Sequence, residues 1–232
     1  MGMNITQVPC NPGNYTAKRS SAIRYLMVHY TGAPGTARNN GAYFASRGDI
    51  GASAHYFVDA QDIVQSVQDS CRAWHCGAVV YKHPECRNDN SIGVELCCYT
   101  NGDGTWYFAP GTVDNAVQLV RSLMAQYNID IDHVVRHYDV TGKVCPEPFV
   151  RDASAWAEFK ARLTAPENAE EEEDMTRYHS IGEMPSYYRE EVAQLVDSGA
   201  LQGDGKHELN VTYDALQAMI VCQRMIDAAA GK

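Results

Sequence analysis

The sequence predicts an α/β fold, because short strand-like runs alternate with helical patterns along the first 165 residues. The strand-like runs lie at residues 24–30, 54–58, 92–98 and 134–135. The helical patterns lie at residues 37–47, 113–127 and 153–163. Strands interleaved with helices of this length are typical of a layered architecture, with helices packed on a sheet.

The strand at 24–30 is predicted from the apolar, β-favouring run Tyr-Leu-Met-Val within it. The helix at 113–127 is predicted from spacing, because its apolar residues recur at i, i+4, i+7, i+11 and i+14 and so share one face. These residues are Val113, Val117, Val120, Met124 and Tyr127.

An acidic run at 166–174 marks the clearest boundary in the chain. Like charges repel each other and this run has no apolar face to bury, which predicts a solvated linker, with an acidic helical turn as the alternative. We therefore expect a first domain at 1–165, a linker at 166–175 and a small helical domain at 176–232. Pro185 and Gly199 suit the two ends of one helix there, and Thr212 suits the start of a second.

Composition excludes several classes of function. The net charge is −10, of which −9 lies in residues 166–232, so non-specific nucleic-acid binding is not expected. No apolar stretch approaches the roughly 20 residues that span a bilayer, and the N-terminal residues lack a secretory signal pattern. We expect a protein that is cytoplasmic in the producing cell, without a signal peptide, and that acts outside the cell only after release. Cys71 and Cys76 are five residues apart and could pair in an oxidising medium, although reduced thiols are more usual here.

Three residues suggest a metal site. His29 stands at the end of the first predicted strand, His137 follows the strand at 134–135, and Cys145 comes eight residues later. Imidazole and thiolate are ligands that zinc prefers, and three protein ligands leave the fourth position open, as in catalytic zinc sites. A His and Cys pair by itself is weak evidence, and a lone His is more often a surface residue.

Glu95 interrupts an otherwise apolar strand. Strand alternation places it on one face with Gly93 and Cys97. It is either a general base that activates water or a solvated residue of an edge strand.

Five motifs occur in the order found in type 2 N-acetylmuramoyl-L-alanine amidases, which this chain resembles over about residues 20–163. The motifs are Val28-His29-Tyr30-Thr31, Ser53-Ala54-His55-Tyr56-Phe57-Val58, Arg72-Ala73-Trp74-His75-Cys76-Gly77, Asn90-Ser91-Ile92-Gly93-Val94-Glu95-Leu96, and His137 followed after seven residues by Cys145-Pro146. These enzymes are zinc hydrolases related to peptidoglycan-recognition proteins. Five ordered motifs are far more specific than any one of them.

The resemblance implies a mixed β-sheet flanked by helices, with a zinc ion in a surface groove. It places the zinc ligands at His29, His137 and Cys145, the water-activating carboxylate at Glu95, and an oxyanion-stabilising amine at Lys143. The substrate it implies is bacterial peptidoglycan, cut at the amide between N-acetylmuramic acid and L-alanine.

The sequence departs from short phage members of the family at Ala54, where those members carry a catalytic tyrosine. We therefore assign the base to Glu95, and expect Tyr56 to point to the face opposite His55, itself a structural residue. For substrate contacts we expect Trp74, His75 and Asn90, with a core position as the alternative for Trp74.

Two other functions compete with this interpretation. A muropeptide-binding module of the same fold typically lacks the cysteine ligand, which is present here. An intracellular muropeptide-recycling amidase has little use for a second domain behind a linker, so a phage or prophage endolysin, or an autolysin, is favoured. Residues 176–232 are expected to attach to cell walls or to form a homo-oligomer.

Overall fold

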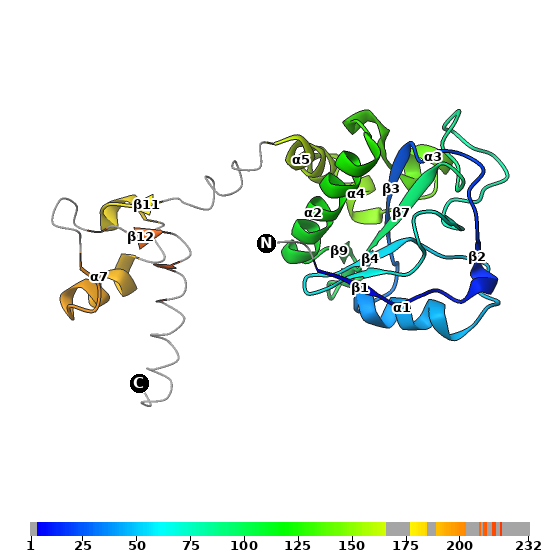
Figure 1. The fold of residues 1–232 in the computed structure, drawn as a ribbon. Helices are drawn as coiled ribbons and strands as arrows, with labels where there is room; N and C mark the ends of the chain where they lie inside the picture. Colours follow the sequence, from blue (N-terminus) through cyan, green and yellow to red (C-terminus); the bar gives the residue numbers. More distant parts are fainter. Residues whose placement is uncertain are drawn as a thin grey trace. The chain divides into compact units, whose positions relative to one another are not determined.

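The computed structural model describes residues 4–165, 177–184, 189–202, 209, 211–212, 215–216 and 219 (Figure 1). The chain divides into two compact units, Met1–Thr164 and Ala165–Lys232. The predicted linker at 166–175 lies outside the described residues. Within the described part of the chain, no helix has the length and apolar character needed to cross a membrane.

A six-stranded sheet forms the centre of the first unit. In spatial order its strands are β1 (Ile5–Gln7), β5 (Ile63–Gln65), β4 (Tyr56–Val58), β7 (Ser91–Leu96), β3 (Tyr25–Tyr30) and β10 (Val134–Arg136). The β4–β5 pair is antiparallel and the other neighbours are parallel. The sheet is therefore mixed, which confirms the predicted fold class.

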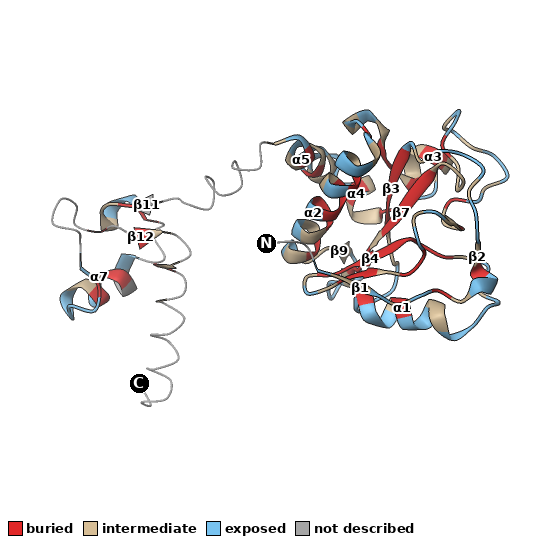
Figure 2. Cartoon of the chain, viewed as in Figure 1, coloured by how far each residue is buried: buried red, intermediate tan, exposed pale blue. Residues whose placement is uncertain are grey.

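Helices cover both faces of this sheet. Their bounds are α1 (Ala37–Ser46), α2 (Pro110–Tyr127), α3 (His137–Thr141), α4 (Glu147–Arg151) and α5 (Ala153–Thr164). The largest buried cluster joins α2 and α5 to one face of the sheet, through residues such as Leu26 and Val94. The smaller cluster around Phe57 joins α1 to the other face of β4 and β5. Figure 2 shows the buried strands between the two layers of helices.

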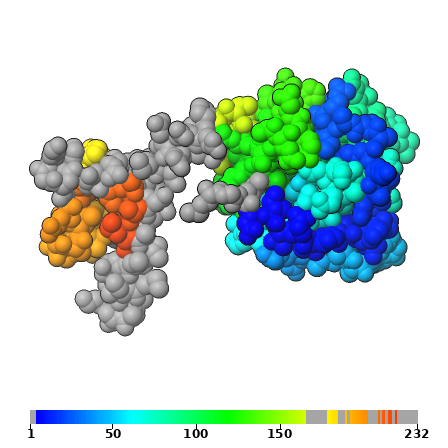
Figure 3. Space-filling view, in the orientation of Figure 1, coloured from blue at the N-terminus to red at the C-terminus, as the bar shows by residue number. Residues whose placement is uncertain are grey.

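The strand predicted at 54–58 is shorter in the structure, and several short elements were not predicted. Among these are β1 and β5 at one edge of the sheet, where Figure 3 shows the blue N-terminal segment against the cyan segment that follows α1. Two further ladders pair β2 (Tyr15–Thr16) with β6 (Arg72–Ala73), and β8 (Tyr99–Thr100) with β9 (Trp106–Tyr107). Short 3-10 helices occupy Pro12–Asn14 and Ile131–His133. Elements of two or three residues are too short to show a hydrophobic period.

The second unit contains one strand pair that the prediction of helices missed. Strands β11 (Arg177–Tyr178) and β12 (Val211–Thr212) pair antiparallel, beside a 3-10 helix at Ile181–Glu183 and helix α7 (Arg189–Asp197). Gly199 follows α7 with φ 74°, as expected for a helix stop. The Thr212 hydroxyl accepts a hydrogen bond from the backbone N–H of Ala215, the contact that an N-cap makes. Pro185 and most of the helix predicted after Thr212 lie outside the described residues.

The described residues of this unit bury a small apolar cluster of their own. Its members are Tyr178, Met184, Val192, Leu195, Leu201, Leu209, Val211 and Leu216. Val192 and Leu195 belong to α7, which lies within the first of the two helices predicted for this region.

Candidate metal centre

Parallel strands bring the two candidate histidines together at the carboxyl ends of β3 and β10. His29 is the penultimate residue of β3, and β10 runs parallel beside it. Since β10 ends at Arg136, His137 begins α3 at the same end of the strands. Both rings are buried, and their centroids lie 4.7 Å apart.

A tight turn after α3 brings Cys145 next to His29 and His137. Helix α3 ends at Thr141, and the next residue, Gly142, has a φ of 86°, in the left-handed region that glycine adopts without strain. The backbone N–H of Tyr138 donates a hydrogen bond to the carbonyl of Cys145 at 2.8 Å, which ties the two ends of the loop together. The Cys145 side chain is buried.

These three residues form a group that could hold one metal ion. The candidate ligand atoms of His29, His137 and Cys145 all lie within 4.8 Å of one another, and Cys145 Sγ is 3.6 Å from His29 Nδ1. Nδ1 of His137 is buried and has no hydrogen-bond partner among the described residues, as expected for an atom left free for a ligand. Two imidazoles and one thiol are a donor set that suits zinc, so the residues present fit this metal.

The metal-free group is electrically neutral. Burial lowers the pKa of His29 well below its usual range and lowers the pKa of His137 to about 4, helped in both by neighbouring positive charge. Burial raises the pKa of the Cys145 thiol to about 12. A bound cation would reverse the last effect, because a thiol that coordinates a metal loses its proton.

Glu95 lies beside this group. On β7 it is in register with His29 of β3, and in-register neighbours on adjacent strands point to the same face. Its Oε2 is buried without a hydrogen-bond partner among the described residues. Burial raises the pKa of this carboxyl to about 8, while the positive charge of Lys143 acts to lower it. Glu95 as a whole is half-buried, and a carboxyl with one buried, unpaired oxygen and a shifted pKa is typical of a functional residue.

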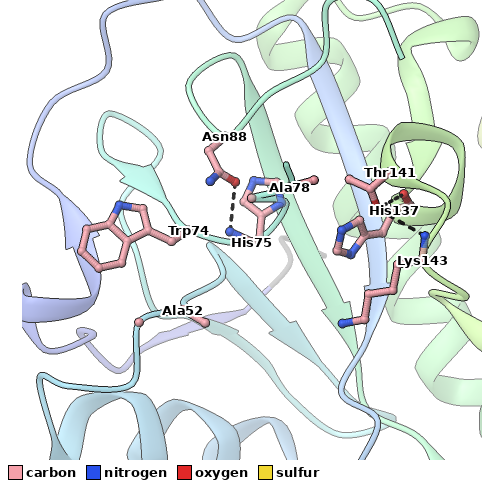
Figure 4. A pocket seen from close by; sticks show the side chains of 10 residues that line it. Ala52, Trp74, His75, Ala78, Asn88, His137, Thr141 and Lys143 are labelled. Atoms are coloured by element: carbon pink, nitrogen blue, oxygen red, sulfur yellow. Dashed lines mark hydrogen bonds between the residues drawn. The ribbon is translucent and has the colours of Figure 1, made fainter. Parts of the chain in front are cut away.

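A pocket of about 470 Å³ opens next to the group. His137, Thr141 and Lys143 line one part of its wall, and Trp74, His75 and Asn88 line another (Figure 4). The Trp74 indole N–H donates to the Thr16 hydroxyl at 3.1 Å, which fixes the orientation of this ring.

Two of the expected substrate contacts, Asn90 and His75, make hydrogen bonds within the protein. Asn90 is absent from the pocket wall: its side chain closes the turn before β7, accepting from the N–H of Arg87 and donating to the carbonyl of Glu85. Asn88 takes a place in the wall, and its Oδ1 accepts from the backbone N–H groups of His75 and Cys76. Asn88 precedes the family motif that begins at Asn90, so that motif did not indicate Asn88 as a residue of the pocket wall.

His75 lines the pocket, but both of its ring nitrogens face protein atoms. Nδ1 lies 3.0 Å from His29 Nε2, and Nε2 lies 3.2 Å from the Ser91 hydroxyl. Burial lowers the pKa of this ring to about 3, so it is neutral at physiological pH. These contacts leave the ring without a free nitrogen for hydrogen bonding to a substrate.

The contacts of His55 and Tyr56 agree with the roles expected for them from the sequence, a structural histidine and a tyrosine on the opposite face. His55 is buried, and its Nδ1 accepts from the backbone N–H of Gly93 at 2.9 Å, a structural contact. Tyr56 packs in the cluster on the opposite face and its hydroxyl donates to Asp69. In the described part of the chain Cys71 and Cys76 are both free thiols, so the structure does not contain the disulfide considered from their spacing.

The fold and the His–His–Cys group together define an α/β domain with a candidate metal site at the edge of its sheet. The chain belongs to the N-acetylmuramoyl-L-alanine amidase family, which matches residues 19–148.

Individual relatives agree with this assignment. The chain is 36% identical over 154 residues to a probable N-acetylmuramoyl-L-alanine amidase of Bacillus licheniformis, a match that covers 62% of this chain and 42% of the relative. Its fold is similar to the catalytic domain of XlyA, with 30% identity, a TM-score of 0.55, and coverage of 69% of this chain and 99% of that domain. The structure of PlyL gives 28% identity, a TM-score of 0.57, and coverage of 71% and 98%. The chain spans less than half the length of the first curated relatives that it matches.

Acid should destabilise the metal-free protein. The pKa values of His29, His55, His75 and His137 are all lowered by folding, chiefly by burial, so at these four rings the unfolded chain binds more protons than the folded one below pH about 6.5. The raised pKa of Glu95 acts in the opposite direction, but at one group against four. The free energy of unfolding is therefore expected to fall as the pH drops from 7 towards 4. Urea unfolding of chelator-treated protein at several pH values measures this, and a free energy that stays constant from pH 7 to pH 5 would contradict it.

Proposed function

We propose that this protein is a zinc-dependent hydrolase that cuts the amide between N-acetylmuramic acid and L-alanine in bacterial peptidoglycan. The observation that carries the proposal is the buried His29, His137 and Cys145 group beside an open pocket. Three protein ligands leave a coordination position for reactants, which is the pattern of catalytic rather than structural zinc. Family membership supports the choice of bond.

In this mechanism His29, His137 and Cys145 would hold the metal. Bound there, zinc would supply Lewis-acid chemistry for the attacking water and the scissile carbonyl. Glu95 accepts a proton from the attacking water at its carboxylate and passes it to the nitrogen of the leaving L-alanine. Its pKa of about 8 applies without a metal, and a nearby cation stabilises the ionised form that a base requires.

Lys143 supplies a second positive charge in the pocket wall. Its charge acts on both Glu95 and His137, which supports a role for the amine near the reacting groups. There it stabilises the negative charge that develops on the carbonyl oxygen.

Replacing Lys143 with methionine should lower kcat by about 10²- to 10³-fold, the usual cost of losing one oxyanion-stabilising group. Zinc affinity should change little, because Lys143 donates no ligand atom. Since the Lys143 charge lowers the pKa of Glu95, the acid limb of the pH–rate profile should also move to higher pH. Steady-state kinetics across pH measure both effects, with Lys160→Met on α5 as the matched control. An unchanged kcat would remove Lys143 from the mechanism.

A digest of purified peptidoglycan by zinc-loaded protein tests the proposed reaction. New alanine amino groups that disappear with a chelator are the expected result. New reducing sugar ends would instead indicate a glycosidase. Wall binding with neither product would indicate a muropeptide-binding module, which the presence of the complete ligand group disfavours.

For the cellular role we propose an endolysin or autolysin that reaches the wall after release from the cell. The second compact unit favours this over a muropeptide-recycling amidase, which needs only a catalytic domain. Rates on intact walls and on anhydro-muropeptides distinguish the two, and a strong preference for the soluble fragment would overturn the proposal.

For the second unit we propose wall attachment or self-association. The small apolar cluster among its described residues supports a folded module, and the net charge of −9 over residues 166–232 disfavours simple attraction to anionic wall polymers. Light scattering of the full chain and sedimentation with purified walls test both roles. A monomer whose wall binding is unchanged by deletion of 166–232 would exclude both.

A further inference from the structure

We propose that His75 is a positioning residue that fixes the tautomer and orientation of His29 for the metal. This inference rests on the proposed zinc centre, and it replaces the substrate-binding role that the sequence suggested for His75. The inference is based on a continuous series of hydrogen bonds, which runs from the candidate ligand group to a backbone carbonyl before β7.

His29 presents its two ring nitrogens to different partners. Nδ1 lies 3.6 Å from Cys145 Sγ and so faces the candidate ligand group. Nε2 lies 3.0 Å from Nδ1 of His75, with the two rings nearly perpendicular at 88°. The other nitrogen of His75 lies 3.2 Å from the Ser91 hydroxyl, which is itself 2.7 Å from the carbonyl oxygen of Arg87.

The proton positions follow from the hydrogen bond between the Ser91 hydroxyl and the Arg87 carbonyl. A carbonyl oxygen has no proton, so the Ser91 hydroxyl must donate to the Arg87 carbonyl. A hydroxyl has a single proton, so towards His75 the Ser91 oxygen can only accept, and Nε2 of His75 carries a proton.

The neutral His75 ring then has a lone pair on Nδ1. Nε2 of His29 donates its proton to this lone pair, which leaves Nδ1 of His29 without a proton and facing the ligand group. In the opposite tautomer, His29 would present an N–H to the metal and could not bind it. A hydrogen-bond acceptor behind a ligating histidine also fixes the ring and increases its basicity.

The surroundings hold the His75 ring in this position. Asn88 Oδ1 accepts from the backbone N–H of His75 at 3.0 Å and thereby fixes the segment that carries the ring. Residue 93 of β7 is a glycine, and a Cβ added there would lie only 2.7 Å from Cγ of His75. The ring therefore fills a space that any side chain at position 93 would occupy.

Zinc affinity of the full chain tests this role separately from catalysis. Competition with a chromogenic chelator should show binding weakened by about 10- to 100-fold in His75→Ala, the usual effect of losing a partner of a metal ligand. His75→Asn should recover part of the affinity, because its Oδ1 can accept from His29 in place of Nδ1. His133→Ala, at a half-buried histidine paired with Asp130, is the control and should bind zinc like the wild type.

Nitrogen NMR of the histidine rings in the unmutated protein tests the same inference without any variant. The expected spectrum shows His29 and His75 both protonated at Nε2. A His29 ring protonated at Nδ1 in the metal-free protein, or equal zinc affinity in His75→Ala and wild type, would overturn the proposal. An unmutated protein that binds no zinc would instead overturn the proposed function.

Discussion

The His29→Ala variant is expected to lose both zinc and amidase activity. Alanine removes one of three candidate ligands and leaves His137 and Cys145, too few to hold a catalytic zinc with protein ligands. Zinc content after gel filtration, measured by mass spectrometry, should fall from one ion per chain to none. Digestion of purified peptidoglycan should fall to the level of a chelator-treated control.

Cys145→Ser should give the same result, because a serine hydroxyl keeps its proton where a metal-bound thiol loses it. Cys71→Ser is the matched control, since Cys71 lies outside the group and its thiol contacts the Ala17 carbonyl. Full zinc content in His29→Ala would show that the metal is held elsewhere.

The second large effect is expected for Glu95→Gln, which should retain zinc but lose about 10²- to 10⁴-fold in rate. Glutamine keeps the size of the side chain and cannot accept a proton from water. The separation of rate from zinc content distinguishes this residue from the ligands. Glu158→Gln, on the exposed side of α5, is the control and should keep the wild-type rate.

Stability of the metal-free protein gives Glu95→Gln an independent readout. Folding raises the pKa of Glu95 from 4.5 to about 8, so the protonated form favours the folded state, and this contribution is lost as the pH rises through that interval. Glu95→Gln should therefore gain stability relative to the wild type at pH 8 compared with pH 5. A wild-type rate in Glu95→Gln would assign the base to another residue.

The central sheet and its helices could be predicted because their longer elements show clear periodicity. The pattern from Val113 to Tyr127 lies within α2, and the run that ends with His29 forms β3. His29 and His137 could be placed together because each stands where a strand ends. The pairing of β11 with β12 could not be predicted, since two-residue strands depend on tertiary contacts rather than on local pattern.

The substrate contacts were the least predictable part of the site. His75 follows Trp74 in a family motif, yet its ring turns towards His29 and Ser91. Asn90 and Asn88 are two residues apart in one loop, and only their hydrogen bonds show which of them reaches the pocket. Such orientations are set by long-range packing, which a single sequence does not display.

X-ray absorption at the zinc edge, on protein loaded with one equivalent of zinc, tests the central claim most directly. The account predicts one sulfur and two imidazole nitrogens around the metal, with an oxygen atom in the remaining position. A spectrum without sulfur, or one with several sulfur neighbours, would contradict the assignment of His29, His137 and Cys145 as the metal ligands.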